Sequence, residues 1–442
     1  MVILQICGRK DLILKKRKLK RKFKILLNRI LFILLLFFTI FLIYKVLKQE
    51  SYIENIEFKD NKAIIYLKEN DLSCILSNSS PTLESKWIKS NDQICKIDIK
   101  NNINNLYILK KEKIIDETNN ILYYELYKNS QIYLANNEEY NYIKYLIGDI
   151  NKLDVKIEND GIISYSNGIV KGIKDGNTNI TFKYKDLIYT SNIEVTSIIN
   201  KMSITNKKAL SCEKYSKEEN DLLDKILKNR IENVGYKTRA GVVEAARFLA
   251  LSFPYKIEYF YENGRQTTNN VDGEGRYYHE GLYLDLSRFE SLTGSSYTNN
   301  KGIWGCKIYS YPDKKKDPNG LDCSGFVSWA LLNGGFDVKD VGAGWSDSLD
   351  LTDYGDVKKL NSSNYSDIRV GDLLHSERLG GHIGIIIGVD NDNFYVAQAI
   401  WYDENGLVVT KIKKKDLYKD FPHVVLMDKY YEKDGLLTNM WN

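Results

Sequence analysis

Outside its N-terminal tail, the sequence lacks any basic patch with interleaved aromatic side chains. Residues 1–29 carry eleven Lys and Arg against a single acid, Asp11, which is a local net charge of +10. The whole chain carries only +5, so the remaining residues have a net charge of −5. A surface with an acidic balance repels phosphate, and the composition therefore argues against nucleic acid as a partner.

A small-x-small cleavage site is also absent after the apolar run at residues 30–44. Basic residues precede this run at 15–24, and extending it to residues 25–47 gives the roughly 20 residues that a membrane crossing needs. The pattern predicts a cytoplasmic basic tail over 1–24 and an uncleaved transmembrane helix over 25–47. It therefore predicts a single-pass cell-membrane protein with extracellular C-terminal domains. A cleaved signal peptide and a buried core helix are the alternatives.

Cysteine is scarce, with six residues at positions 7, 74, 95, 212, 306 and 323. Cys74 and Cys95 lie close together in a strand-rich region and could form a disulfide. Cys212 and Cys306 could form a second one. Pairing cannot be deduced from sequence, but Cys323 is then left over, and an odd cysteine in an exported domain suggests a reactive thiol.

Two successive regions have the alternating pattern of strands. Residues 51–125 contain short alternating runs separated by polar clusters, which is typical of a small immunoglobulin-like β-sandwich. Residues 129–197 alternate in the same way, with turn signals at Asn167-Gly168 and at 175–177. The second region resembles the bacterial Ig-like group 2 domain through its segment from Gly176 to Thr181. That resemblance implies a spacer or adhesive module.

Helical patterns begin near residue 210. Residues 216–219 form a capping box ahead of an apolar helical face, and Thr238 is a candidate cap for a second helix. The Tyr-, Gly- and Asn-rich stretch 256–302 has no assignable pattern.

The segment 319–335 has the strongest chemical signal. Asp322 is a good N-cap, so Cys323 is expected at the first position of a helix. The partial positive charge of the helix dipole favours thiolate there, and thiolate is the nucleophilic form. The alternative is a small, inert, buried cysteine at a helix start.

A histidine follows about sixty residues later, in the segment 369–390. This segment predicts two strands around a glycine-rich turn, with His382 at the start of the second strand beside Gly384. A histidine within reach of a helix-borne cysteine would act as its general base. The strand 394–399 then carries Gln398, which would orient the imidazole if the hairpin is centred near Asp390. An ordinary surface His382 and a half-buried strand Gln398 are the alternatives.

Together these motifs resemble the NlpC-type family of papain-like cell-wall cysteine peptidases. The resemblance covers about residues 235–430 and implies Cys323 as nucleophile, His382 as base and Gln398 as the third polar residue. It implies cleavage of amide bonds in peptidoglycan stem peptides, commonly after D-glutamate, with no metal and no other cofactor. The assigned substrate-binding residues are Asp322, Ser324, Trp304 and Trp345.

The chain departs from the family upstream of its cysteine. The usual oxyanion-hole tyrosine is replaced by Gly302, and Cys306 replaces a glycine of the W-G-G segment. Tyr309 or Tyr311 could substitute, and backbone N–H groups at the start of the Cys323 helix are the other candidates.

The predicted fold class is multidomain: a transmembrane helix, two Ig-like β-sandwiches and an α+β papain-like domain over 210–430. The predicted function is a peptidoglycan endopeptidase. A papain-like amidase or acyl transferase and a non-catalytic wall-binding or adhesion protein are the alternatives.

Overall fold

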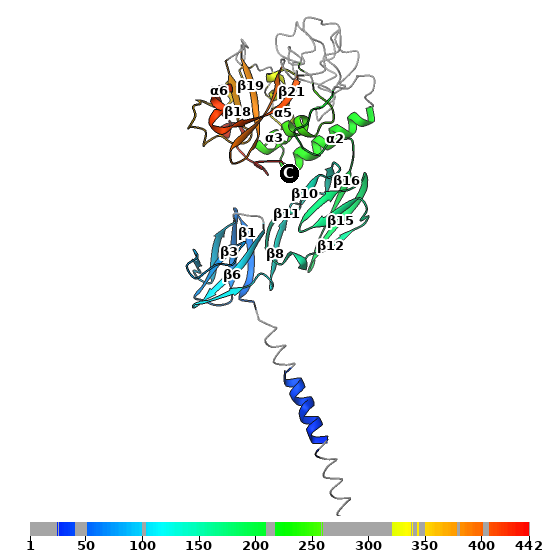
Figure 1. Ribbon diagram of the computed structural model, residues 1–442, viewed down its shortest axis with the longest axis vertical. Helices are drawn as coiled ribbons and strands as arrows, with labels where there is room; N and C mark the ends of the chain where they lie inside the picture. Colours follow the sequence, from blue (N-terminus) through cyan, green and yellow to red (C-terminus); the bar gives the residue numbers. More distant parts are fainter. Residues whose placement is uncertain are drawn as a thin grey trace, which may run out of the picture. The chain divides into compact units, whose positions relative to one another are not determined.

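The described part of the chain forms two compact units (Figure 1). The computed structural model describes residues 24, 26–39, 51–99, 103–208, 217–257, 259, 321–336, 338, 343, 350–377, 381–400 and 406–441. The first unit comprises Met1–Tyr124 with Tyr145–Asp149, and the second comprises Glu125–Lys144 with Ile150–Asn442. The module boundaries expected at 125, 129, 197 and 210 stay predictions.

The first unit is built from two β-sheets. Its strands are β1 (Ile53–Lys59), β2 (Lys62–Leu67), β3 (Leu72–Ser77), β4 (Ile88–Lys89), β5 (Ile94–Asp98), β6 (Ile103–Lys110), β7 (Lys113–Asp116), β8 (Leu122–Leu126) and β11 (Ile143–Gly148). One sheet has the order β1-β2-β5 and the other β4-β3-β6-β11-β8, with β7 paired to β6. Buried residues of both sheets, including Ile65 and Ile108, form one core, because alternate side chains of each strand point inward.

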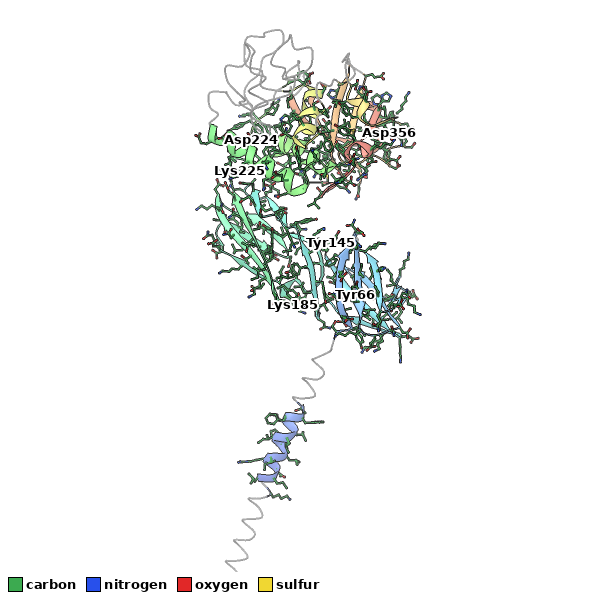
Figure 2. The ribbon with its side chains drawn as sticks, turned by 180° about the vertical axis from the view of Figure 1, so that it is seen from behind. Tyr66, Tyr145, Lys185, Asp224, Lys225 and Asp356 are labelled. Carbon is green, nitrogen blue, oxygen red and sulfur yellow. A yellow bond between two sulfur atoms is a disulfide. The ribbon has the colours of Figure 1, made fainter. Side chains whose placement is uncertain are left out.

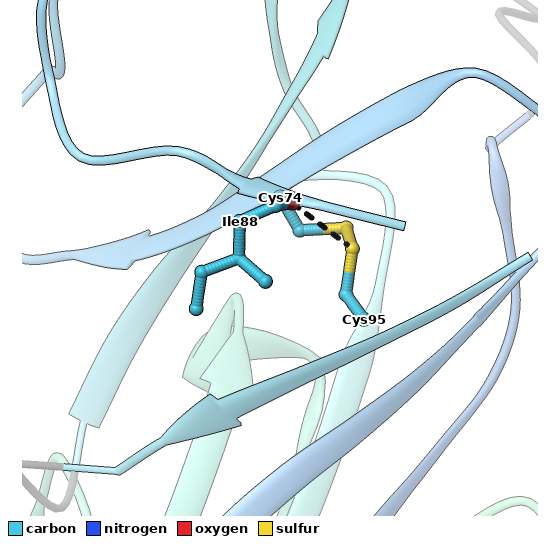
Figure 3. Close-up of a disulfide and its surroundings, with 3 residues drawn as sticks. All are labelled: Cys74, Ile88 and Cys95. Atoms are coloured by element: carbon cyan, nitrogen blue, oxygen red, sulfur yellow. Dashed lines mark hydrogen bonds between the residues drawn. A yellow bond between two sulfur atoms is a disulfide. The ribbon is translucent and has the colours of Figure 1, made fainter. Parts of the chain in front are cut away.

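A disulfide joins the two sheets of this unit. Cys74 on β3 and Cys95 on β5 are bonded to each other, and both are fully buried. Figure 3 shows the bridge, with the Cys95 sulfur 3.5 Å from the carbonyl oxygen of Ile88. The first of the two expected pairings is therefore confirmed, whereas Cys212 and Cys306 lie outside the described residues.

The expected membrane anchor was wrong. Residues 26–39 are helical, but no helix in the described part of the chain combines the length and the apolar character that a membrane crossing requires. This finding overturns both the transmembrane helix over 25–47 and the single-pass membrane location. Apart from Lys24, the basic tail 1–24 lies outside the described residues.

The second unit begins with two further sheets. Their strands, with one short helix, are β9 (Gln131–Leu134), β10 (Glu139–Asn141), η1 (Ile150–Lys152), β12 (Asp154–Ile157), β13 (Ile163–Ser166), β14 (Ile169–Gly172), β15 (Gly176–Tyr184) and β16 (Leu187–Val195). The strand orders are β10-β14-β13 and β12-β15-β16-β9. Asn167 and Gly168 both have positive φ between β13 and β14, so the expected Asn-Gly turn is confirmed. Phe182 packs against Tyr142, with ring centroids 4.9 Å apart.

Helices follow these sheets. They are α2 (Lys217–Val234), α3 (Arg239–Arg247), the π-helix η3 (Phe248–Ser252), α5 (Cys323–Asn333), η4 (Leu351–Tyr354), η6 (Lys414–Asp416), α6 (Leu417–Asp420) and α7 (Asp428–Tyr431). Leu223, Ile226 and Ile231 of α2 are fully buried, as their spacing predicts. The expected cap of α3 is confirmed, since the Thr238 side chain accepts a hydrogen bond from the N–H of Gly241.

Buried polar contacts join helix α2 to the connection between β9 and β10 and to η3. Arg230 donates to Glu138 at 2.7 Å and to the Ser252 hydroxyl at 3.0 Å, and the two charged side chains are only 9% and 8% exposed. Figure 2 labels Lys225 on the same helix. The Lys225 ammonium lies 5.8 Å from the ring centroid of Tyr133. Tyr133 also belongs to the hydrophobic core that α2 shares with the C-terminal sheet.

The C-terminal sheet has six antiparallel strands. They are β17 (Asp356–Lys359), β18 (Leu373–Ser376), β19 (His382–Val389), β20 (Asn393–Ile400), β21 (Gly406–Lys413) and β22 (His423–Leu426). Their order is β17-β22-β18-β19-β20-β21, and α3 and α5 pack against β19 (Figure 1). Ile383 and Ile385 face the core that contains α5, while Ile386 and Phe394 face a second core on the opposite side.

The expected fold class was also wrong. The described residues are 40% strand and 24% helix, so β-sheet dominates, and no α+β domain of the papain type is evident among them. The physical reason is that capping and periodicity specify where single helices and strands begin, whereas sheet architecture depends on pairing between distant strands.

Candidate cysteine–histidine site

The first element of the site is the start of helix α5. Asp322 has an extended backbone, and its carboxylate accepts a hydrogen bond from the N–H of Gly325 at 2.8 Å. The Ser324 hydroxyl donates to the same oxygen at 3.2 Å. Aspartate is a preferred N-cap residue because it satisfies N–H groups that have no partner within the helix. Cys323 is therefore the first helical residue, as the sequence predicted.

The Cys323 thiol is surrounded by backbone donors in an otherwise dry setting. It is 7% exposed and is the one free cysteine among the described residues. The backbone N–H groups of Ile383, Ser324 and Cys323 itself favour the thiolate. Burial opposes them, and together with the charge of Asp322 it raises the pKa of the Cys323 thiol to about 12. Burial thus opposes the preference for thiolate that the helix start provides.

His382 is held by Gln398 on the neighbouring strand. Its Nε2 lies 2.6 Å from Gln398 Oε1, and Gln398 Nε2 donates to the Thr410 hydroxyl at 2.9 Å. An amide oxygen can only accept, so Nε2 of His382 has the proton. Nδ1 is then the nitrogen with a free lone pair, and it is the atom that can take a proton from a thiol.

Gly384 has no side chain, and this allows His382 and Gln398 to meet. Ile385 pairs with Ala397, and continuing that register by one residue sets Gly384 opposite Gln398. A Cβ at Gly384 would lie 2.9 Å from Val396 Cγ1 and 3.4 Å from Gln398 Cβ. Without that Cβ, His382 and Gln398 meet as diagonal neighbours on one face of the sheet.

The surroundings keep the His382 imidazole neutral. Burial lowers its pKa, the nearby His375 lowers it further, and the hydrogen bond to Gln398 acts in the opposite direction. The Phe421 ring stacks against the imidazole, with centroids 5.8 Å apart. Since an unperturbed histidine titrates near pH 6.5, His382 is a proton acceptor at neutral pH.

Cys323 and His382 both lie near the start of strand β19. The Cys323 sulfur accepts a hydrogen bond from the N–H of Ile383, and that N–H follows directly on His382 at the start of β19. Helix α5 and strand β19 therefore meet at the thiol. The catalytic roles assigned to Cys323, His382 and Gln398 stay predictions, although the contacts suit them.

The residues assigned to substrate binding have a different status. Asp322 and Ser324 are 7% and 4% exposed, and their side chains bond within the cap of α5. Their substrate-binding role stays a prediction. Trp304 and Trp345 lie outside the described residues, as do Tyr309, Tyr311, Gly302 and Cys306.

Sequence reasoning missed three partners of the site. Thr410 and Phe421 contact Gln398 and His382, respectively, and His375 is buried on β18 with Nε2 3.3 Å from the Ala343 carbonyl oxygen. The sequence pattern around Thr410 is that of a strand. Which residue of the preceding strand lies next to Thr410 depends on the length and path of the connection 401–405. In the described part of the chain, no group of three or more His, Cys, Asp or Glu could hold a metal ion. The expectation that no metal takes part stays a prediction.

Comparison with known proteins gives little further information. No family model matches the chain, and no curated protein matches it. Domains 4 and 5 of the S-layer protein SbsC match with 17% identity over 21% of this chain and 64% of theirs, at a TM-score of 0.14. A longer structure of that protein, residues 31–844, matches with 15% identity over 34% of this chain and 24% of its own, also at 0.14. The chain thus spans less than two thirds of either SbsC structure.

A C-terminal intimin fragment, solved in complex with the intimin-binding domain of its translocated receptor, shows a similar match. It shares 12% identity over 42% of this chain and 80% of the fragment, at a TM-score of 0.15. At such low TM-scores these likenesses carry no argument about fold or function.

Proposed function

We propose that this protein is a cysteine-dependent hydrolase that cleaves amide bonds through an acyl-enzyme at Cys323. The observation that supports this most is the 2.6 Å contact between His382 Nε2 and Gln398 Oε1. Gln398 accepts from Nε2 and leaves Nδ1 unprotonated, beside the strand residue whose N–H contacts the Cys323 thiol. A neutral thiol next to a neutral, correctly oriented imidazole is a competent nucleophile and base pair.

The reaction follows from these two groups. Nδ1 of His382 takes the thiol proton as the sulfur attacks the amide carbonyl carbon, so the neutral pair becomes an ion pair only during reaction. The carbon–nitrogen bond then breaks, and the imidazolium returns its proton to the leaving amine. A water molecule attacks the resulting thioester while His382 takes one of its protons. That proton returns to the sulfur as the acid leaves.

Backbone groups at the start of α5 suit the developing oxyanion. The N–H groups of Cys323 and Ser324 favour negative charge at the sulfur, and a carbonyl carbon bonded to that sulfur would place its oxygen near the helix start. Donors fixed by an N-cap need no reorientation during the reaction. This source of stabilisation uses none of the tyrosines at 309 and 311.

The substrate class rests on the sequence motifs. The Asp-Cys-Ser-Gly start of α5 and the Gly-His-Ile-Gly start of β19 resemble those of NlpC-type enzymes, which act on peptidoglycan stem peptides. We therefore propose a stem-peptide amide of peptidoglycan as substrate. An amidase or acyl transferase would use the same thioester, and a wall-binding protein would need neither residue.

The test is digestion of purified peptidoglycan by the full chain, with mass spectrometry of the released fragments. We expect Cys323→Ala to lower release by at least about a thousandfold, because removal of the nucleophile eliminates the covalent route. Ser328→Ala alters a buried residue of the same helix and is the matched control. It should retain activity.

Three outcomes separate the proposal from its rivals. Equal release by wild type and Cys323→Ala would refute the catalytic role. Sedimentation of both with peptidoglycan, and release by neither, would favour a binding protein. Release that yields amine-capped peptides when a primary amine is added would identify an acyl transferase.

A further inference from the structure

We infer that Phe421 is a positioning residue of the proposed reaction, and that the face of its ring stabilises the imidazolium that His382 becomes when it takes the thiol proton. The inference rests on the proposed function, because it concerns the base of that reaction. Phe421 acts on the reaction through His382, against whose ring it stacks.

The protonated base has little electrostatic support from its other neighbours. Gln398 holds Nε2 of His382 at 2.6 Å, but its amide is neutral and supplies no opposite charge. Burial and His375 both disfavour a positive charge on the imidazole, and the groups of the described residues that act on its pKa include no carboxylate. The positive charge on His382 therefore forms without a counter-ion in the described part of the chain.

The Phe421 ring lies where its face can attract this charge. The two rings are close to parallel, with an angle of 27° between their planes and 5.8 Å between their centroids. The face of a benzene ring has a partial negative charge, and it attracts a cation that lies within about 6 Å of the ring centroid. The imidazolium spreads its charge over a flat ring, so this stacked arrangement favours the protonated form over the neutral one.

Phe421 is fixed in this position by its backbone and by the core. Its N–H donates to the carbonyl oxygen of Leu417 at 2.9 Å, at the end of α6. Its side chain is only 2% exposed and belongs to the same core as Leu417 and Val424. Little water can screen an attraction in such a setting, and a fixed ring needs no rearrangement when the charge forms.

The ring also has an opposite effect, which the experiment must hold constant. By excluding water from the imidazole, Phe421 contributes to the burial that disfavours a positive charge. An alanine at this position would change both effects at once. Replacement of Phe421 by mono-, di- and trifluorinated phenylalanine keeps the ring and its packing, while each fluorine withdraws electrons from the ring face and weakens its attraction for a cation.

The test is an NMR titration of the His382 ring in the full chain, combined with the kinetics of peptidoglycan cleavage. We expect the pKa of His382 to fall stepwise with each fluorine, by roughly half a pH unit over the series. We expect kcat to fall in the same order, by about threefold in the trifluorinated protein. KM should stay unchanged, because a ring that is 2% exposed does not meet the substrate.

Phe394 provides the matched control. It is another buried ring of the same core, and its fluorination should change neither the pKa of His382 nor kcat. A loss of kcat from either fluorinated position without a lower pKa of His382 would indicate a merely structural effect and would overturn the inference.

The outcomes are distinct from those of the proposed function. An unchanged or raised pKa of His382 across the Phe421 series overturns the inference, whether or not the protein is an enzyme. A lowered pKa with an unchanged kcat also overturns it, since the ring would then have no part in the reaction. If peptidoglycan is not cleaved by the unmodified protein, the proposed function fails, and the titration alone decides whether Phe421 stabilises the imidazolium.

Discussion

The two units each bury a cysteine, and the two settings differ in the groups around the sulfur. In the first unit, Cys74 and Cys95 are fully buried among aliphatic side chains and bonded to each other between two sheets. In the second unit, Cys323 is 7% exposed and has backbone donors from α5 and β19. Similar burial thus accompanies a cross-link in one place and a candidate nucleophile in the other. The polar groups around a sulfur indicate its role better than its exposure does.

The largest expected effect on stability comes from removing the cross-link. The bridge spans a sequence separation of 21, and a closed loop of that size stabilises a fold by about 3 kcal/mol through the unfolded chain. Cys74→Ala with Cys95→Ala should lower the free energy of unfolding of the first unit by about that amount, as measured by urea denaturation. Peptidoglycan cleavage at 25 °C should be unchanged.

The opposite pattern is expected for the second unit. Cys323→Ala should abolish cleavage and leave the urea transition of the first unit where it was. If the double variant loses cleavage in proportion to its stability, the two cysteine settings are coupled, and the contrast between them fails.

A smaller effect is expected from pH. Burial and His375 lower the pKa of His382, so the acid limb of kcat/KM should have its midpoint below pH 6.5, the ordinary histidine value. Cleavage should be full above this midpoint and fall about tenfold per pH unit below it, as the base becomes protonated. Gln398→Ala removes a contact that raises the pKa, so its midpoint should move lower still. An acid limb at or above pH 6.5 would contradict the assignment of His382 as a buried base.

The smallest effect is expected at the cap of α5. Asparagine caps a helix about as well as aspartate, so Asp322→Asn should keep the fold and remove one charge that raises the thiol pKa. Alkylation of Cys323 at pH 8 should become a few-fold faster, as measured by mass spectrometry. Asp350→Asn changes the cap of η4 in the same way and is the control. An unchanged alkylation rate would show that Asp322 has no electrostatic effect on the sulfur.

Local signals allowed much of the candidate site to be predicted. The position of Cys323 at the helix start could be predicted from Asp322, because this N-cap involves only Asp322 and the three residues that follow it. The contact between His382 and Gln398 depended on a turn, and that turn is specified by Asp390, which accepts from the N–H groups of Asp392 and Asn393. The contact between Gln398 and Thr410 could not be predicted, because it depends on the connection 401–405, whose sequence contains no turn signal.

Properties that depend on more than a few residues were predicted poorly. The thiolate expected from the helix dipole is opposed by burial, which is a tertiary property. The fold class was taken from motifs that specify single elements, whereas the described chain is dominated by sheets formed between distant strands. The apolar run near the N-terminus predicted a membrane-spanning helix, and no helix among the described residues is long and apolar enough for one.

The buried pair of Arg230 and Glu138 has a practical consequence for work with fragments of this chain. A recombinant piece cut near residue 210, where the helical pattern begins, would lack the strand residues Tyr133 and Ala135 that complete the core around α2. The apolar side of α2 would then face water and favour aggregation. A fragment that contains the second unit should therefore begin before β9, near Glu125, where that unit starts.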